Sequence, residues 1–160
     1  MAQPTIRPAR KADAPGLNAA LRRLSQDMGD THLARDDQIE KAGFGAVPVF
    51  YALLAEHDGA MVGAAVYSPL FSTTRGMAGS YVSDLWVDTD LRGRQLGARL
   101  LAAVQKDAQD RWDSGFIRLA VYHANRRAMK FYERLGFAAA AGEATMTLES
   151  DSLTNLEKYL

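Results

Sequence analysis

Four segments of the chain carry apolar residues at the three- and four-residue spacing of amphipathic helices. The clearest one contains Leu96, Leu100, Val104, Ala108 and Trp112. Another begins behind Asp13, which is typical of an N-cap, and contains Leu17, Leu21 and Leu24. Two shorter helices are predicted over 36–42, ending at Gly43, and over 125–135, closed by Gly136 in the C-cap position.

The segments between these helices have the composition and length of β-strands. Strands are predicted over 5–9, 47–56, 61–67, 81–87 and 116–122, with a final pair over 137–141 and 144–148. The proline of the first strand suits an edge position, and His57-Asp58-Gly59 predicts a hairpin turn. The order β-α-α-β-β-β-α-β-α-β predicts an α/β (α+β) fold with a mixed central sheet and helices on both faces.

Size and composition narrow the functional class. A chain of 160 residues without repeats predicts a single domain over 1–160, and 48% hydrophobic residues suffice for a sizeable core. Nineteen basic residues balance nineteen acidic ones, so no global field attracts nucleic acid or a membrane. Because cysteine is absent, thiol catalysis and Cys-ligated zinc are excluded and a cytoplasmic location is favoured. We expect no metal, no nucleic acid and no membrane partner.

The loop before the strongest helix has the features of an anion site. It reads Arg92-Gly93-Arg94-Gln95-Leu96-Gly97 and follows a predicted strand. Glycine lets the backbone approach an anion, and the free N–H groups of the first helical turn point toward it. The helix dipole and two arginines favour phosphate or pyrophosphate. A surface turn with solvated arginines is the alternative, because neither the Walker nor the Rossmann glycine spacing is present.

A second motif downstream gives the loop a context. It reads N-x-x-A-x-x-F-Y-x-x-L-G-F and runs from Asn125 through Tyr132 to Phe137. Together the two motifs resemble the GNAT superfamily of N-acetyltransferases, whose first motif is [QR]-x-x-G-x-[GA]. Arg92 matches its first position, while Gln95 stands where the family has its middle glycine. The resemblance covers most of the chain and extends through the last predicted strand.

The resemblance implies an acetyl-CoA-dependent enzyme whose central sheet is splayed between its fourth and fifth strands. Acetyl-CoA, the acetyl donor, would lie in this splay with its pantetheine arm paired like an added strand, and an N–H near Val87 would polarise the thioester. The expected cofactor-binding residues are Leu85, Trp86, Val87, Arg92, Gly93, Arg94, Gln95, Leu96, Gly97, Ala98, Asn125, Arg127 and Lys130. For Trp86 a place in the core is the alternative, and for Arg127 and Lys130 it is solvated charge.

Proton transfer needs an acid and a base, and the sequence offers a clearer acid. The resemblance implies that Tyr132 protonates the coenzyme A thiolate, a phenol of pKa about 10 acting on a thiol of about 8.5. It also implies a glutamate as base at position 83, where this chain has Ser83, which can only orient a water. His123 is another candidate base, with a surface histidine as its alternative. Asp84 faces the opposite side of the strand unless a bulge intervenes.

The acceptor is expected to be a primary amine of a small molecule. Gly43-Phe44-Gly45 and the segment 81–87 look similar to the diamine (spermidine/spermine-type) acetyltransferase branch, whose members acetylate polyamines or lysine-like amines. Asp27, Asp30 and Ser83 are the expected substrate contacts. An aminoglycoside, an amino acid or a protein N-terminus are alternative acceptors, and a non-catalytic acyl-CoA-binding or regulatory module is an alternative function. The branch also implies a homodimer.

Overall fold

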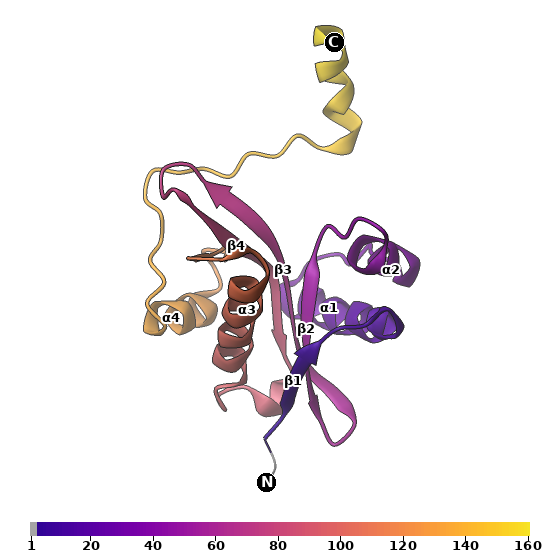
Figure 1. Cartoon of the computed structure of the whole chain (residues 1–160), viewed down its shortest axis with the longest axis vertical. Helices are drawn as coiled ribbons and strands as arrows, with labels where there is room; N and C mark the ends of the chain where they lie inside the picture. The colour runs from indigo at the N-terminus through magenta and orange to yellow at the C-terminus, as the bar shows by residue number, and fades with distance from the viewer. Residues whose placement is uncertain (1–2) are drawn as a thin grey trace. The chain divides into compact units, whose positions relative to one another are not determined.

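The chain divides into two units, Met1–Tyr122 and His123–Leu160, and the computed structural model describes residues 3–160. Each unit is described by itself. The first holds a five-stranded sheet in the order β1-β2-β3-β4-β5, shown in Figure 1. Its elements are β1 (Thr5–Pro8), α1 (Ala14–Met28), α2 (Asp36–Phe44), β2 (Tyr51–His57), β3 (Ala60–Ser72), β4 (Met77–Val87), α3 (Leu96–Trp112) and β5 (Ile117–Leu119).

The sheet is mixed, as the order of elements predicts. β1, β2, β3 and β4 pair antiparallel with their neighbours, and β5 pairs parallel to β4. β1 forms one edge, where Pro8 is tolerated because an edge strand need not donate from every N–H. The predicted hairpin joins β2 to β3 through Asp58 at φ 50° and Gly59 at φ 77°, two left-handed residues that fit a tight two-residue turn.

Helices cover both faces of the sheet, because the side chains of each strand alternate between them. Val66 packs in the cluster that contains α1, whereas the next residue, Tyr67, points to α3 and donates its hydroxyl to Asp107 Oδ2 at 2.5 Å. Gly63 lets α3 approach β3 closely, since a Cβ there would lie 3.0 Å from a methyl of Leu100. The α/β architecture with helices on both faces is confirmed.

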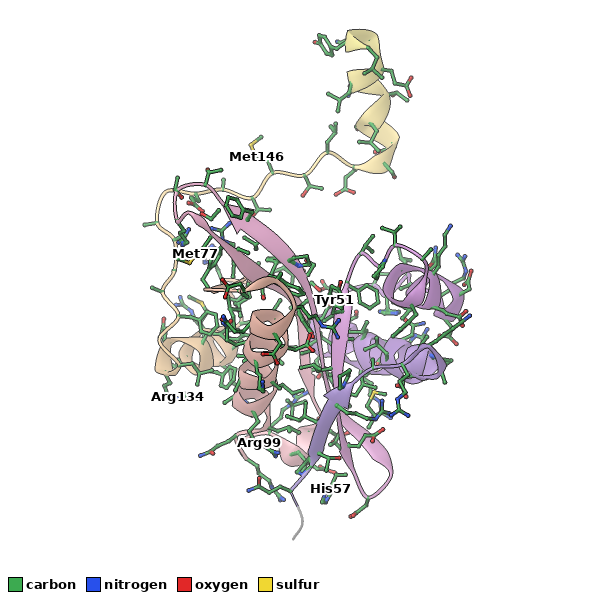
Figure 2. All side chains as sticks on the ribbon, viewed as in Figure 1. Tyr51, His57, Met77, Arg99, Arg134 and Met146 are labelled. Atoms are coloured by element: carbon green, nitrogen blue, oxygen red, sulfur yellow. The ribbon has the colours of Figure 1, made fainter. Side chains whose placement is uncertain are left out.

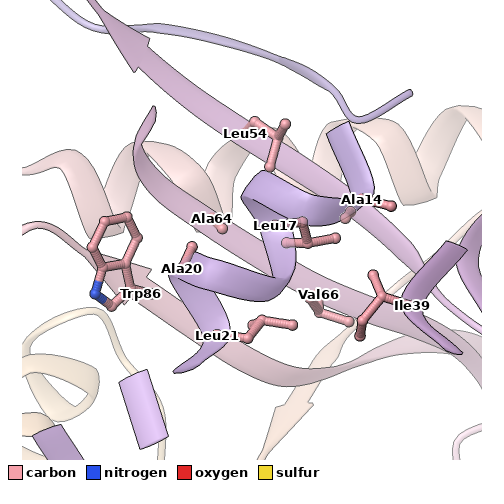
Figure 3. Close-up of a cluster of buried hydrophobic side chains, with 10 residues drawn as sticks. Ala14, Leu17, Ala20, Leu21, Ile39, Leu54, Ala64, Val66 and Trp86 are labelled. Atoms are coloured by element: carbon pink, nitrogen blue, oxygen red, sulfur yellow. The ribbon is translucent and has the colours of Figure 1, made fainter. Parts of the chain in front are cut away.

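The core under α1 joins three strands to one helical stripe. Figure 3 shows the apolar side chains of α1 and α2 together with those of β2, β3 and β4 against which they pack. They are Ala14, Leu17, Ala20, Leu21, Ile39, Leu54, Ala64, Val66 and Trp86. Leu17 and Leu21 belong to the predicted stripe, which therefore marks the buried face of α1 correctly. Asp13 occupies the N-cap position, yet its carboxylate binds Arg7 and the Arg10 N–H instead of capping α1.

Several predicted boundaries are wrong. α2 does not end at Gly43 but continues to Phe44, with Gly45 as its C-cap. β2 begins at Tyr51 rather than at position 47, and β3 and β4 extend beyond the predicted 61–67 and 81–87. The predicted strand over 116–122 shrinks to β5, which has three residues. These differences concern how far strands find partners, which local composition does not encode.

The second unit contains α4 (Arg126–Arg134) and a 3-10 helix over Ser150–Tyr159. α4 matches its predicted start, because the Asn125 side chain accepts from the Ala128 N–H at 3.1 Å. Its C-cap is Leu135 rather than Gly136, which follows with a left-handed φ of 93°. The predicted strand pair over 137–141 and 144–148 is wrong, because these residues form no strand within the described unit. Across residues 3–160 no helix has the length and apolarity needed to cross a membrane.

Candidate active site

The distinctive feature of the sheet is that β4 loses its neighbour on one side. β4 and β5 pair only at Ser80, Tyr81 and Val82 of β4. β4 then continues to Val87 and remains paired with β3 along this stretch. Residues 84–87 therefore have a partner on the β3 side and none on the β5 side among the described strands. This fork is the splay that the sequence predicts between the fourth and fifth strands.

Alternation along β4 decides which backbone groups face the fork. The Asp88 N–H donates to Val62 O at 2.9 Å, so Asp88 faces β3. Two residues earlier Trp86 also faces β3, because antiparallel partners exchange hydrogen bonds at every second residue. Leu85 and Val87 consequently direct their N–H and C=O groups to the open side. The Trp86 side chain belongs to the core under α1 and is 3% exposed, so it does not line the open side of β4.

A β-bulge lies at the start of the fork. The register between β3 and β4 shifts here and leaves Ser83 as the extra residue of β4. A bulge brings two successive side chains to one face, and Ser83 Oγ accordingly donates to Asp84 Oδ2 at 2.7 Å. Asp84 lies two residues before Trp86 and so shares the α1 face of the sheet. The sequence predicts that Asp84 lies on the same side as Ser83 only if β4 contains a bulge, and the structure has this bulge.

Arg92, the first residue of the loop motif, holds the end of β4 against α1. Its Nε donates to Val87 O at 2.9 Å, and its Nη2 forms a short ion pair with Asp27 of α1. A second bridge runs in parallel, since Arg23 of α1 lies 3.5 Å from the Asp88 carboxylate. Two of the predicted site residues thus neutralise each other, and neither Arg92 nor Asp27 is a free charge.

The rest of the loop leaves the N-terminus of α3 uncapped. Gly93 and Gln95 adopt left-handed φ values of 80° and 65°, and no side chain caps the helix. The Arg99 N–H is the first to find a backbone acceptor, Gln95 O at 3.0 Å. The N–H groups ahead of it, on Leu96, Gly97 and Ala98, are free to bind an anion. Gln95, which stands at the position of a motif glycine, is thus one of the few described non-glycine residues with a left-handed φ.

A cavity of about 210 Å³ lies against the same helix end. It is lined by Gln3, Pro4, His57, Leu91, Arg94, Gln95, Leu96 and Arg99. Figure 2 shows His57 and Arg99 at the same end of the sheet. Arg99 is partly engaged, because its Nη2 donates to Pro4 O at 2.8 Å. Arg94 forms no ion pair among residues 3–160, so this end of α3 carries a free positive charge.

The loop after α1 brings a further carboxylate to the end of β5. Asp30 Oδ2 accepts from the Tyr122 hydroxyl at 3.0 Å, and this bond raises the pKa of Tyr122. His32 in the same loop is held by the fully buried Asn18, whose Oδ1 lies 2.8 Å from His32 Nε2. His32 therefore fixes the loop that carries Asp30. The sequence gives no sign of the Asp30–Tyr122 contact, because the two residues lie far apart along the chain.

The second unit carries the downstream motif. Burial raises the pKa of Tyr132, whose ring packs edge-on against Phe137 with centroids 5.5 Å apart. Asn125 is accounted for as the N-cap of α4. Arg127 and Lys130 are exposed on α4, and neither has a carboxylate partner among residues 3–160. His123, at the beginning of this unit, is exposed.

Comparison with known proteins assigns this constellation. Residues 18–137 match the model of the acetyltransferase (GNAT) family. The chain belongs to the GNAT acetyltransferase family. It is 28% identical to the thialysine N-epsilon-acetyltransferase of Sus scrofa, over 98% of each chain, and 30% identical to that of Bos taurus, over 85% of each. The protein is accordingly an N-acetyltransferase, and the similarity to the diamine acetyltransferase branch is borne out.

Solved structures support the fold of this GNAT protein. An integron cassette protein from the mobile metagenome of V. cholerae aligns with a TM-score of 0.80 at 20% identity, over 99% of each chain. An aminoglycoside acetyltransferase from an uncultured soil sample, in complex with sisomicin, aligns with a TM-score of 0.74 at 17% identity, over 91% of this chain and 97% of the other. At such identities the likeness shows the shared fold alone.

The GNAT site needs a long, anionic donor, and the described residues fit one. The open edge at Leu85 and Val87 offers peptide groups to an amide-containing chain, and the uncapped end of α3 offers N–H groups to phosphate. Within residues 3–160 no cluster of three or more His, Asp or Glu side chains is placed to hold a metal.

The Arg92–Asp27 contact generates the first prediction. A double-mutant cycle with Arg92→Ala and Asp27→Ala should give a coupling of about 1 kcal/mol in urea unfolding, since the side chains are only 29% and 41% exposed and Arg92 also binds a carbonyl. Lys106–Asp110 is the control, with 78% and 63% exposure and an expected coupling of about 0.3 kcal/mol. Equal coupling in both pairs would show that Arg92 does not hold β4 to α1.

Proposed function

We propose that this GNAT protein transfers the acetyl group of acetyl-CoA directly to a primary amine of a small, lysine-like molecule. The observation that carries the proposal is the open edge of β4 at Leu85 and Val87, next to the uncapped N-terminus of α3. An added chain can pair with the edge while its phosphates bind the helix end. The named acceptor of the curated relatives, thialysine, gives the amine its class.

The donor would supply an acetyl thioester, and the chain would orient it. Peptide groups of Leu85 and Val87 hold the pantetheine arm as an added strand, because their hydrogen bonds have no partner in β5. Since Val87 O already accepts from Arg92, its N–H is the group left to polarise the thioester carbonyl. Gly93, Arg94, Gln95, Leu96, Gly97 and Ala98 bind the pyrophosphate, and Asn125, Arg127 and Lys130 contribute from the second unit.

The acceptor is cationic at neutral pH, which suits the acidic residues near the fork. Asp30 and Asp84 face no basic side chain within ion-pair distance among the described residues, whereas Asp27 and Asp88 are paired with arginines. A small dication or a lysine-like amine therefore meets uncompensated carboxylates. We propose that Ser83 and Asp30 contact this amine and that Asp27 acts indirectly, through Arg92.

Tyr132 is proposed to protonate the departing thiolate. Burial raises its pKa above 10, so the phenol stays protonated throughout the range in which an amine acetyltransferase works. A raised pKa is compatible with the proposed role, because a general acid must keep its proton until the thiolate forms. The role of His123 as a base is weaker, since its exposed imidazole has no orienting partner among residues 3–160.

The proposal extends to how the protein exists in the cell. We propose that residues 1–160 act as one catalytic domain in the cytoplasm, consistent with the absence of cysteine. Several apolar side chains near the C-terminus are exposed, and we propose that they contribute to a homodimer. They are Met146, Leu148, Leu153, Leu156, Tyr159 and Leu160. Sedimentation analysis of the full chain tests this assembly.

A non-catalytic acyl-CoA-binding module is the second candidate. Position 83 holds a serine in place of the glutamate that the resemblance implies as base, and Gln95 replaces a motif glycine. A module of this kind would bind coenzyme A through the fork without acetylating an amine. Turnover measurements separate the two candidates directly.

The acceptor class is tested with a panel of amines. Thialysine, lysine, spermidine and an aminoglycoside are each incubated with acetyl-CoA, and released coenzyme A is followed. We expect thialysine or lysine to give the highest kcat/KM, by about tenfold or more, because thialysine is the acceptor named for the curated relatives; a tenfold preference corresponds to about 1.4 kcal/mol. Coenzyme A binding by calorimetry with no turnover of any amine would instead establish the non-catalytic module.

The role of Tyr132 gives a separate prediction. Tyr132→Phe should lower kcat by about a hundredfold, the usual contribution of a positioned acid, while the Kd for coenzyme A changes less than threefold. Wild-type kcat should not fall as pH rises from 7 to 9.5, because the raised pKa keeps the acid form present. Tyr51→Phe, in β2 and outside the proposed site, is the control. An unchanged kcat in Tyr132→Phe would remove the acid role.

A further inference from the structure

We propose that Asp84 receives the proton of the acceptor ammonium, doing the work of the glutamate that is missing at position 83. This inference rests on the amine acetylation proposed above. It assigns the base, which the sequence leaves unassigned, to the second residue of the bulge in β4. The geometry of the bulge, the fork and the local charges supports it in three steps.

The bulge determines on which face of the sheet the Asp84 side chain lies. In a regular strand the side chains of Ser83 and Asp84 would lie on opposite faces, so an aspartate could not replace a glutamate one position earlier. The register shift in β4 removes this obstacle, and the 2.7 Å hydrogen bond from Ser83 Oγ to Asp84 Oδ2 shows that both side chains lie together. The carboxylate therefore occupies the region that a side chain at position 83 would reach.

Asp84 lies close to the point where β4 and β5 separate. The last pair between β4 and β5 is Val82 with Leu119, so Asp84 is the second residue beyond the point where the strands part. Leu85, the first residue after it, directs its backbone to the open edge proposed to hold the thioester. The carboxylate is thus tied through one peptide unit to the backbone that binds the donor.

The charge environment leaves Asp84 available. Among residues 3–160 no basic side chain lies within 4.0 Å of its carboxylate, and Ser83 is its one side-chain hydrogen-bond donor. The neighbouring carboxylates differ: Asp88 lies beside Arg23 and Asp27 beside Arg92. An ionised carboxylate without a cation attracts the ammonium group of the acceptor. Once the ammonium is bound, it is the group whose proton the carboxylate can take.

Acetyl transfer to the amine moves protons at both Asp84 and Tyr132. The acceptor ammonium loses a proton to Asp84, directly or through one water, and its freed electron pair forms a C–N bond to the acetyl carbon. The C–S bond breaks with its electrons on sulfur, and the thiolate takes a proton from Tyr132. As the amide forms, its nitrogen loses a second proton to solvent, and the Tyr132 phenolate takes one proton back from solvent. Asp84 then releases its proton, so that of the two protons lost by the ammonium, one is balanced by the proton on the coenzyme A thiol and one is released.

The test is Asp84→Asn, which keeps the shape and the Ser83 contact but removes the base. We expect kcat/KM for the amine to fall about a hundredfold. The Kd for coenzyme A should change less than threefold, and thermal unfolding should show that the variant is folded. Asp58→Asn, at an 86% exposed carboxylate in the β2–β3 turn, is the matched control and should retain wild-type turnover. Asp84→Asn with wild-type kcat/KM would overturn the inference while leaving the acetylation intact.

A compensating variant separates a proton acceptor from a structural role. Ser83→Glu in the Asp84→Asn background should restore at least a tenth of the lost kcat/KM, because both side chains reach the same region. Acceptor amines of lower pKa should also suffer a smaller loss in Asp84→Asn, since less proton transfer is required. No rescue, together with a loss independent of amine pKa, would overturn the base assignment. If the wild type acetylates no amine but binds coenzyme A, the proposed function itself fails.

Discussion

The site depends on one constraint: β4 pairs with both β3 and β5 at Ser80, Tyr81 and Val82, and with β3 alone from Asp84 to Val87. Peptide groups that leave a ladder must find water or another partner, because buried unpaired ones are costly. Leu85 and Val87 are in this position, and their groups are aimed at the space that β5 vacates. A ligand able to act as a strand is the natural partner for such an edge.

A bulge, an arginine tether and a helix N-terminus lie next to the open edge of β4. The bulge at Ser83 changes which backbone groups face β5, so the reversal of alternation coincides with the point where pairing stops. Arg92 ties the end of β4 to α1 through Val87 O and Asp27. α3 starts directly after this tether and presents an uncapped N-terminus. The proposed donor and acceptor contacts thus involve a few neighbouring residues of one strand.

Local rules were enough to predict most of the elements from the sequence. The apolar stripe of α3, the Asp58-Gly59 turn and the Asn125 cap each depend on neighbours within four residues, and each is confirmed. How far each strand extends depends instead on partner strands that are distant in the sequence. Alternating residues over 144–148 are typical of a strand, yet they form none in the described unit, since alternation cannot say which strand would pair with them.

The candidate site follows the same division. The loop motif and the downstream helix identify the family from residue types and spacing alone. The engagement of Arg92 with Asp27 joins residues 65 positions apart, and the bulge depends on the register against β3, so neither is visible in the sequence. Asp84 is an example: the extra residue in β4 brings its carboxylate from the face opposite Ser83 to the same face as Ser83.

The most direct test of the account is amide hydrogen exchange at β4, read by NMR with and without ligand. Coenzyme A should slow exchange at the N–H of Leu85 or Val87, which face the open edge, while Trp86, bonded toward β3, should exchange slowly in both states. Adenosine 3′,5′-bisphosphate, which lacks the pantetheine arm, should leave Leu85 and Val87 unprotected. Equal protection by both ligands, or none from coenzyme A, would contradict the claim that the donor pairs with the open edge of β4.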